Sequence, residues 1–238
     1  MKTLLVFTLL FISLPGQSQI EKPGIANPST YLNDLRNEMQ TEWPDNRTIN
    51  LVFHGHSVPA GYFKTPHVNT ISAYPNVVMK KLKALYPFAV INIIVTAIGG
   101  ENSVRGAERF EGDVLIHKPD ALLIDYALND RGPGLEKSYI AWKQMIIQAK
   151  EKNIKVILLT PSPDQRVDYS ISDNALKKHT DQIIRLADEH QVGLVDSYKA
   201  FEFSYININV LGKYMSQVNH PNEKGHELIA DEIMKYFR

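Results

Sequence analysis

Five short apolar runs, rich in β-branched residues, alternate along this chain with longer amphipathic segments. The runs are residues 49–53, 89–97, 121–127, 155–160 and 192–195. The amphipathic segments, with apolar residues at helical spacing, are residues 72–85, 103–117, 135–151, 174–190 and 223–237. Strands that are apolar throughout are buried on both faces, which is typical of parallel sheets covered by helices. The pattern predicts an α/β fold, a three-layer α/β/α sandwich around a five-stranded parallel sheet.

The length and charge of the chain fit one domain of this kind. Its 238 residues are enough for one full core and too few for two comfortable ones. Lysine plus arginine equals aspartate plus glutamate at 26 each, and no basic run predicts a nucleic-acid partner. We therefore expect a leader at residues 1–18, an N-terminal arm at 19–48 with a short helix around 31–40, and one domain at 49–238.

Residues 1–18 have the pattern of a secretory signal peptide. A lysine at position 2 precedes an apolar stretch at 3–14, and residues 15–18 offer small residues for cleavage after Ser18. The apolar stretch is too short for a comfortable transmembrane helix. We therefore expect export, to the periplasm or outside a bacterial cell, without stable membrane insertion. The chain has no cysteine, so its stability must come from the core without disulfides.

Polar and glycine-rich residues follow four of the five apolar runs. They occupy residues 55–57, 99–102, 129–132 and 161–163. The carboxyl ends of parallel strands meet at one edge of the sheet, where folds of this class bind their ligands. The sequence therefore predicts a functional site at that edge.

Three of these polar or glycine residues, with a histidine near the C-terminal end, suit ester hydrolysis by a serine. Such a reaction needs a nucleophile, a base and donors for the developing oxyanion. Ser57 lies where the first run breaks into a loop, and His220 lies just before the last predicted helix. Gly100 can present its backbone N–H, and Asn129 can donate its side-chain amide. Each residue alone also fits a turn, a cap or a surface histidine, so only the combination points to catalysis.

In order and spacing, these residues match the motifs of the SGNH hydrolases, the GDSL-like esterase/lipase family. The matching segments are Gly55-His56-Ser57 with residues 60–62, Gly100, Ala127–Asp130, and residues 217–221 followed by Gly225-His226. The chain resembles this family over about residues 49–237. The resemblance implies a flavodoxin-like fold and a serine hydrolase without a cofactor. It also implies Ser57 as nucleophile, His220 as base, and an oxyanion hole made by Ser57, Gly100 and Asn129.

The chain departs from the family motifs at three positions. His56 replaces an aspartate, Ala127 replaces a glycine, and Gln217 stands where the family has the aspartate that orients the histidine. A carboxylate would fix the imidazole tautomer and stabilise the imidazolium, whereas glutamine carries no charge. We therefore expect a Ser57–His220 dyad or an incomplete triad. Gln217, or a backbone carbonyl near residues 217–219, would then orient the ring.

Two other interpretations of the segment around Ser57 are weaker. A nucleophile elbow, Gly-x-Ser-x-Gly, would need a glycine where the chain has Pro59. A metal could bind His54 and His56, which share one face of an extended segment, but no further ligand has suitable spacing. We expect these histidines to pack or to form hydrogen bonds, and we expect no metal.

The sequence thus predicts an exported serine esterase, with short acyl groups on carbohydrate, such as acetyl esters, as preferred substrates by analogy. A lysophospholipase-like or thioesterase-like acyl hydrolase is one alternative. A non-catalytic carbohydrate-binding or ligand-binding protein on the same fold is another, because of Gln217. Tyr62, Phe63 and Tyr74 are candidates for lining the site. The sequence gives no signal for the oligomeric state.

Overall fold

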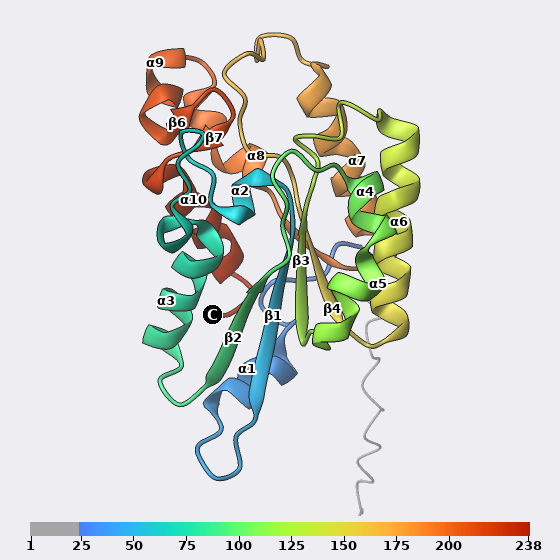
Figure 1. The fold of residues 1–238 in the computed structure, drawn as a ribbon, viewed down its shortest axis with the longest axis vertical. Helices are drawn as coiled ribbons and strands as arrows, with labels where there is room; N and C mark the ends of the chain where they lie inside the picture. Colours follow the sequence, from blue (N-terminus) through green and yellow to red (C-terminus); the bar gives the residue numbers. More distant parts are fainter. Residues whose placement is uncertain (1–23) are drawn as a thin grey trace, which may run out of the picture.

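A computed structural model describes residues 24–238 of the chain (Figure 1). The strands are β1 (Thr48–Gly55), β2 (Val90–Val95), β3 (Ala121–Asp125), β4 (Lys155–Leu159), β5 (Gly193–Val195), β6 (Met215–Gln217) and β7 (His220–Pro221). The α-helices are α1 (Asn33–Gln40), α2 (Ser57–Ala60), α3 (Tyr74–Leu85), α4 (Ser103–Glu108), α5 (Phe110–Asp113), α6 (Leu135–Glu151), α7 (Ala175–His190), α8 (Ser197–Ala200), α9 (Ile208–Leu211) and α10 (Glu223–Met234). The leader expected at residues 1–18 lies outside the described part.

The central sheet has five parallel strands in the order β2-β1-β3-β4-β5, which confirms the predicted fold class. β1 lies between β2 and β3, with Phe53 opposite Val95 and Gly55 opposite Asp125. The polar residues that follow these three strands therefore meet at one edge of the sheet. That edge is at the top of Figure 1, where α2 and the β6–β7 hairpin also lie.

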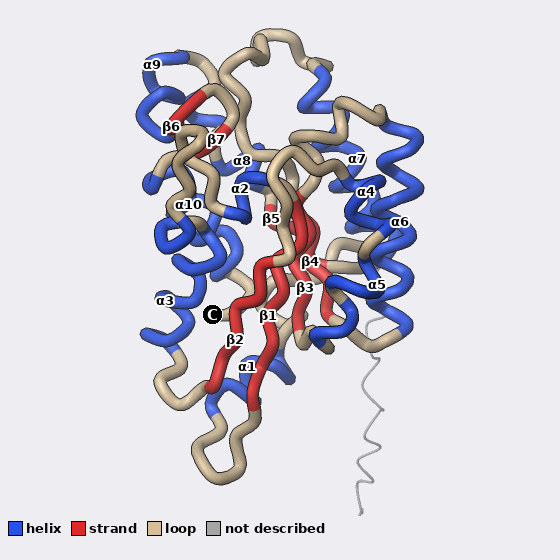
Figure 2. Tube along the Cα trace, viewed as in Figure 1, coloured by secondary structure: helices blue, strands red, loops and turns tan. Residues whose placement is uncertain are grey.

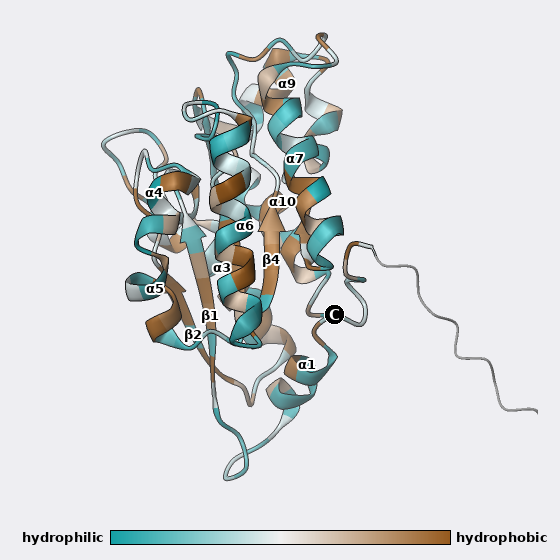
Figure 3. Ribbon diagram, turned by 90° about the vertical axis from the view of Figure 1, so that its right-hand side faces the viewer, coloured by the Kyte–Doolittle hydropathy of each residue, from teal (hydrophilic) through white to brown (hydrophobic). Residues whose placement is uncertain are grey.

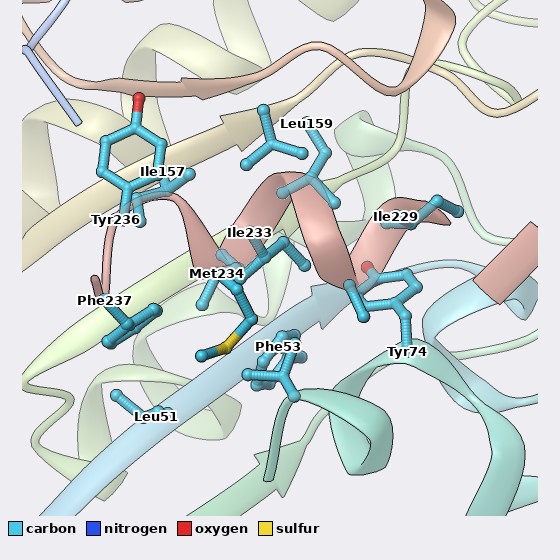
Figure 4. Close-up of a cluster of buried hydrophobic side chains, with 14 of the residues drawn as sticks. Leu51, Phe53, Tyr74, Ile157, Leu159, Ile229, Ile233, Met234, Tyr236 and Phe237 are labelled. Atoms are coloured by element: carbon cyan, nitrogen blue, oxygen red, sulfur yellow. The ribbon is translucent and has the colours of Figure 1, made fainter. Parts of the chain in front are cut away.

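Helices cover both faces of the sheet (Figure 2). Alternate side chains of β1 point to opposite faces, so Leu51 and Phe53 belong to one buried cluster and Val52 belongs to the other. The first cluster includes residues of α1, α3 and α10, and the second includes residues of α4, α5, α6 and α7. Figure 4 shows the first cluster, where Ile229 and Ile233 of α10 face Phe53 and Tyr74. The molecule is therefore a three-layer α/β/α sandwich.

The hydropathy of the elements explains these layers (Figure 3). β4 is apolar along most of its length because four of its five residues are buried under helices. In contrast, α7 carries a polar band towards solvent and buries Leu176, Ile183 and Leu186. No helix among residues 24–238 is long and apolar enough to cross a membrane.

One long predicted helix is broken in the structure. The segment 103–117 forms α4, α5 and a 3₁₀ turn at Leu115–His117. The first break falls at Arg109, whose side chain turns to bond Glu101 and the carbonyl of Thr96. The other predicted helices agree with the observed ones to within three residues at each end.

The short helix expected around residues 31–40 is present as α1. It packs Leu35 and Met39 into the first buried cluster. The assignment of residues 19–48 to a separate arm stays a prediction, as does the boundary of the domain at residue 49.

Three histidines, His54, His179 and His226, are buried in the fold. Burial lowers the pKa of His54 to about 4, of His179 to about 4 and of His226 to about 3. Nearby cationic groups, Arg109 for His54 and Arg131 for His179, act in the same direction. These rings are therefore neutral in the folded protein at pH values where the unfolded chain binds protons.

We predict that the free energy of unfolding falls as the pH is lowered from 6.5 to 5. The unfolded state binds more protons in this range, so each buried histidine should contribute a loss of about 1.5 kcal/mol. Denaturant titrations at several pH values would measure it. An unfolding free energy that stays constant over this range would contradict the prediction.

Candidate active site

Ser57 is the first residue of α2, directly beyond the end of β1. The turn needs glycine at position 55, because a Cβ there would lie 2.4 Å from the carbonyl oxygen of Asp125. His56 caps the helix, since its Nδ1 accepts a hydrogen bond from the N–H of Val58 at 3.2 Å. The strand end and the capped turn together hold Ser57 at the sheet edge, where the residue is 7% exposed.

His220 reaches Ser57 from the other end of the chain. It belongs to the β6–β7 hairpin, whose strands were not predicted from the sequence, and α10 follows this hairpin as predicted. Asn222 caps α10 through the N–H groups of Lys224 and Gly225. The Nε2 of His220 lies 2.8 Å from the Oγ of Ser57, although 163 residues separate the two in sequence. The predicted nucleophile and the predicted base are therefore in hydrogen-bond contact.

The other ring nitrogen of His220 contacts a backbone carbonyl. Its Nδ1 lies 3.0 Å from the carbonyl oxygen of Phe63. A carbonyl can only accept, so this contact requires a proton on Nδ1 and leaves the Nε2 lone pair free for the hydroxyl of Ser57. That is the tautomer that a general base needs. The carbonyl comes from the loop after α2, and not from residues 217–219 as the sequence analysis suggested.

Gln217 also faces the ring, but with its amide nitrogen. Its Nε2 lies 2.7 Å from Nδ1 of His220, while its Oε1 accepts a hydrogen bond from the N–H of Thr65 at 3.0 Å. The contact with Thr65 fixes which end of the amide faces the histidine. An amide N–H₂ group offers Nδ1 no acceptor, so it opposes the tautomer that the carbonyl of Phe63 favours. Gln217 thus links the β6–β7 hairpin to the loop that contains Thr65, but its amide cannot replace a carboxylate as the partner of His220.

Burial and hydrogen bonding act in opposite directions on His220. Desolvation has the largest effect and lowers the pKa of its imidazole below the usual value. The carbonyl of Phe63 acts in the other direction, because it stabilises the protonated ring. The net shift is downward, so His220 is a neutral base at neutral pH.

The candidate oxyanion donors lie at the same sheet edge. The backbone N–H groups of Ser57 and Gly100 have no acceptor among the described residues. Gly100 has φ of +77° and open space around its Cα, so a substrate atom can approach its backbone. Asn129 donates one amide hydrogen to the carbonyl of Glu101 at 2.8 Å, which leaves its second hydrogen available.

Glu101 anchors this part of the edge. Its carboxylate accepts hydrogen bonds from the Arg109 side chain and, at 2.6 Å, from the hydroxyl of Tyr126. The neighbouring Asp130 accepts the N–H of Ser103 at 2.8 Å. These buried contacts hold the loop that carries Gly100 against the loop that carries Asn129.

The remaining candidates from the sequence occupy different places. Tyr62 is partly exposed, with its ring centroid 6.2 Å from that of His220, and it can line the site. Phe63 and Tyr74 are buried, so their side chains pack beneath the site. Both rings of the His-x-His pair are engaged: His54 contacts Thr96 Oγ1 at 2.9 Å, and His56 caps α2. Residues 24–238 contain no cluster of three or more potential metal ligands.

Two groups at this site were not predicted from the sequence. The carbonyl of Phe63 leaves no trace in a sequence, because every residue has one. Asp125 lies 3.3 Å from His56, with Oδ1 facing Nε2, and it had a visible signal. It is a charged residue inside the otherwise apolar run 121–127.

The chain matches a family model for the GDSL-like lipase/acylhydrolase family over residues 53–228. A comparison with curated proteins found no match. Among solved structures, a two-domain esterase active on acetylated mannans is similar, with TM-score 0.69 and 22% identity over 90% of this chain and 54% of the esterase. This chain thus spans about half the length of that esterase. An acetylxylan esterase from Geobacillus stearothermophilus, Axe2, gives TM-score 0.66 and 20% identity over 79% of this chain and 94% of Axe2.

We predict that Gln217→Glu increases reactivity at Ser57. The substitution keeps the length of the side chain and places a carboxylate beside Nδ1 of His220, where it stabilises the imidazolium. The kcat/KM for 4-nitrophenyl acetate should rise about tenfold, and its acidic limb should move to higher pH. pH–rate profiles of both proteins would measure the change.

Gln217→Met serves as the matched control, since it removes the amide without adding charge. An equal gain in Gln217→Met would mean that loss of the amide donor is responsible, and not the carboxylate. No gain in either variant would mean that the carbonyl of Phe63 already orients the ring fully.

Proposed function

The chain belongs to the GDSL-like lipase/acylhydrolase family, and from this premise we propose that it is an exported serine esterase that cleaves short acyl esters of carbohydrates. The contact of 2.8 Å between Ser57 Oγ and His220 Nε2 carries this proposal. It joins a nucleophile at a strand end to a base whose other nitrogen faces a carbonyl acceptor. The preferred acyl group in this proposal is acetyl.

In the first half of the reaction, the Oγ of Ser57 attacks the acyl carbon of the ester. His220 accepts the hydroxyl proton on Nε2, while its Nδ1–H stays bonded to the carbonyl of Phe63. The charge that develops on the acyl oxygen is stabilised by the N–H groups of Ser57 and Gly100 and by the free amide hydrogen of Asn129. His220 then returns the proton to the departing alcohol, and an acyl-enzyme remains.

In the second half, a water molecule replaces the alcohol. His220 removes a proton from the water, which attacks the acyl-enzyme, and the same donors stabilise the second oxyanion. Collapse of this intermediate releases the carboxylic acid and restores the hydroxyl of Ser57. None of these steps requires a cofactor.

The proposed substrate class rests on similarity and on the surface of the site. Esterases of similar fold act on acetylated mannans and acetylated xylan. Tyr62 stands beside His220 and packs close to Gly99, so an aromatic ring borders the catalytic pair on the surface. Aromatic rings are common contacts for the apolar faces of sugars. The signal-peptide pattern at residues 1–18 supports export, which would bring the protein to polysaccharides outside the cell.

Two other functions remain as outcomes of the tests. A lysophospholipase-like or thioesterase-like acyl hydrolase would use the same catalytic pair on longer acyl chains. A non-catalytic ligand-binding protein is favoured by one observation, the neutral Gln217 in place of a carboxylate beside His220.

We predict that a fluorophosphonate probe labels Ser57 and that Ser57→Ala abolishes both labelling and hydrolysis of 4-nitrophenyl acetate. His220→Ala should lower kcat by about 10⁴-fold or more, because the hydroxyl then lacks a base. Chelators should leave the activity unchanged. A folded wild-type protein that neither labels nor hydrolyses aryl acetates would overturn the enzyme proposal and support the binding protein.

The acyl preference can be tested with matched substrates. We expect kcat/KM to fall from acetyl to butyryl to octanoyl esters of one alcohol, and we expect release of acetate from acetylated xylo- and manno-oligosaccharides. Faster hydrolysis of octanoyl esters, lysophospholipids or thioesters would instead assign the protein to the second group of acyl hydrolases.

A further inference from the structure

A buried carboxylate lies beneath the nucleophile. Asp125 is the last residue of β3, and only 3% of it is exposed. Its Oδ1 lies 3.3 Å from the Nε2 of His56, within ion-pair distance, and neither atom forms a hydrogen bond within residues 24–238. In addition, the backbone carbonyl of Asp125 accepts a hydrogen bond from the backbone N–H of His56 at 3.2 Å. These two buried atoms face each other at a distance where the charge of the carboxylate acts on the ring, outside the geometry of a hydrogen bond.

The opposite side of the His56 ring faces the catalytic turn. Its Nδ1 accepts the N–H of Val58 at 3.2 Å and lies 3.5 Å from the Oγ of Ser57. An atom that accepts an N–H carries no proton, so the proton of the neutral ring must be on Nε2, towards Asp125. The hydrogen bond at Nδ1 thus requires this tautomer, and the carboxylate of Asp125 near Nε2 favours the same one.

A chain of contacts connects Asp125 with the base on the other side of Ser57. The hydroxyl of Tyr74 donates to Oδ2 of Asp125 at 3.1 Å, and the backbone N–H of Tyr74 donates to Nδ1 of His226 at 3.1 Å. The ring of His226 is stacked on Phe63, with centroids 4.9 Å apart and an interplanar angle of 17°. The carbonyl of Phe63 in turn holds His220. Nucleophile and base are thus supported by one buried set of contacts.

We propose that His56 and Asp125 form a positioning pair for the nucleophile. Asp125 keeps His56 in the tautomer with the proton on Nε2, and His56 then fixes the first turn of α2. This turn carries both the hydroxyl and the N–H of Ser57, so the pair sets their direction relative to His220. The inference rests on the proposed function, because it assigns a role at the same catalytic site. It places the carboxylate–imidazole pair of this protein beside the serine and not beside the base.

The tautomer of His56 tests the first part of the proposal without any activity measurement. Nitrogen-15 NMR of histidine-labelled protein distinguishes a protonated from an unprotonated ring nitrogen, and His56→Asn identifies the signals of this ring. In the wild type we expect a proton on Nε2 and none on Nδ1. In Asp125→Asn we expect a mixture of tautomers, because an asparagine can offer Nε2 an N–H donor. Protonated Nδ1 in the wild type, or an unchanged tautomer in folded Asp125→Asn, would overturn the proposal.

A double-mutant cycle tests the effect on the nucleophile. Asp125→Asn should reduce both kcat for 4-nitrophenyl acetate and the rate of fluorophosphonate labelling about tenfold, with KM nearly unchanged. In the His56→Asn background the same change should cost less than about twofold, since Asp125 acts through His56. Equal losses in both backgrounds would show that Asp125 does not act through His56 and would overturn the proposal.

A second comparison avoids Asp125 if its variant does not fold. His56→Asn keeps an acceptor for the N–H of Val58. His56→Leu removes this acceptor, and leucine has a volume similar to that of histidine. We expect labelling of Ser57 to be at least about fivefold slower in His56→Leu than in His56→Asn, at equal folded fractions. Equal labelling rates would contradict a positioning role. If the wild type shows no labelling at all, the proposed function fails, while the NMR experiment still decides the tautomer.

Discussion

The parallel pairing of β1 with β2 and β3 is the constraint on which the site depends. Backbone hydrogen bonds set Gly55 opposite Asp125 and Phe53 opposite Val95. This pairing places the first residues beyond these strands close enough for their side chains to meet, before any of them interacts with substrate. Ser57, Gly100 and Asn129 come from segments far apart in sequence, and the sheet alone brings them to one edge. The helices on both faces exclude water from that sheet and hold the ends of its strands in place.

In the proposed mechanism, His220 becomes positively charged in a buried site. A buried imidazole that must become positively charged loses hydration, and the pKa of His220 is accordingly lowered. A carboxylate beside Nδ1 would offset this cost, but the chain has the amide of Gln217 there and uses the dipole of the Phe63 carbonyl. The carbonyl selects the tautomer with the proton on Nδ1, but it stabilises the charged ring less than a carboxylate would. As the proposed base, His220 is therefore oriented by this carbonyl but only weakly stabilised as a cation.

The fold could be predicted from the sequence because its signal is distributed over many residues. The five strands agree with the predicted runs to within two residues at each end. The helix expected over 103–117 was wrong in its continuity, because the contact of Arg109 with Glu101 is a tertiary interaction that helical spacing does not reveal. Ser57 and His220 were predicted from motif residues, and the structure brings them together. The carbonyl of Phe63 and the direction of the Gln217 amide depend on backbone and rotamer geometry, which residue identity does not encode.

The position of the β6–β7 hairpin has a consequence for the life of the chain in the cell. Ser57 is synthesised 163 residues before His220, its proposed base, and before α10, which covers one face of the sheet. A chain that is still being synthesised therefore carries Ser57 before the proposed base exists. Since contacts over such separations form late and slowly, reactivity and structural completion arrive together. In the proposed mechanism, a chain that stops before His220 has a serine without a base, so the order of these residues delays hydrolysis until the β6–β7 hairpin has folded.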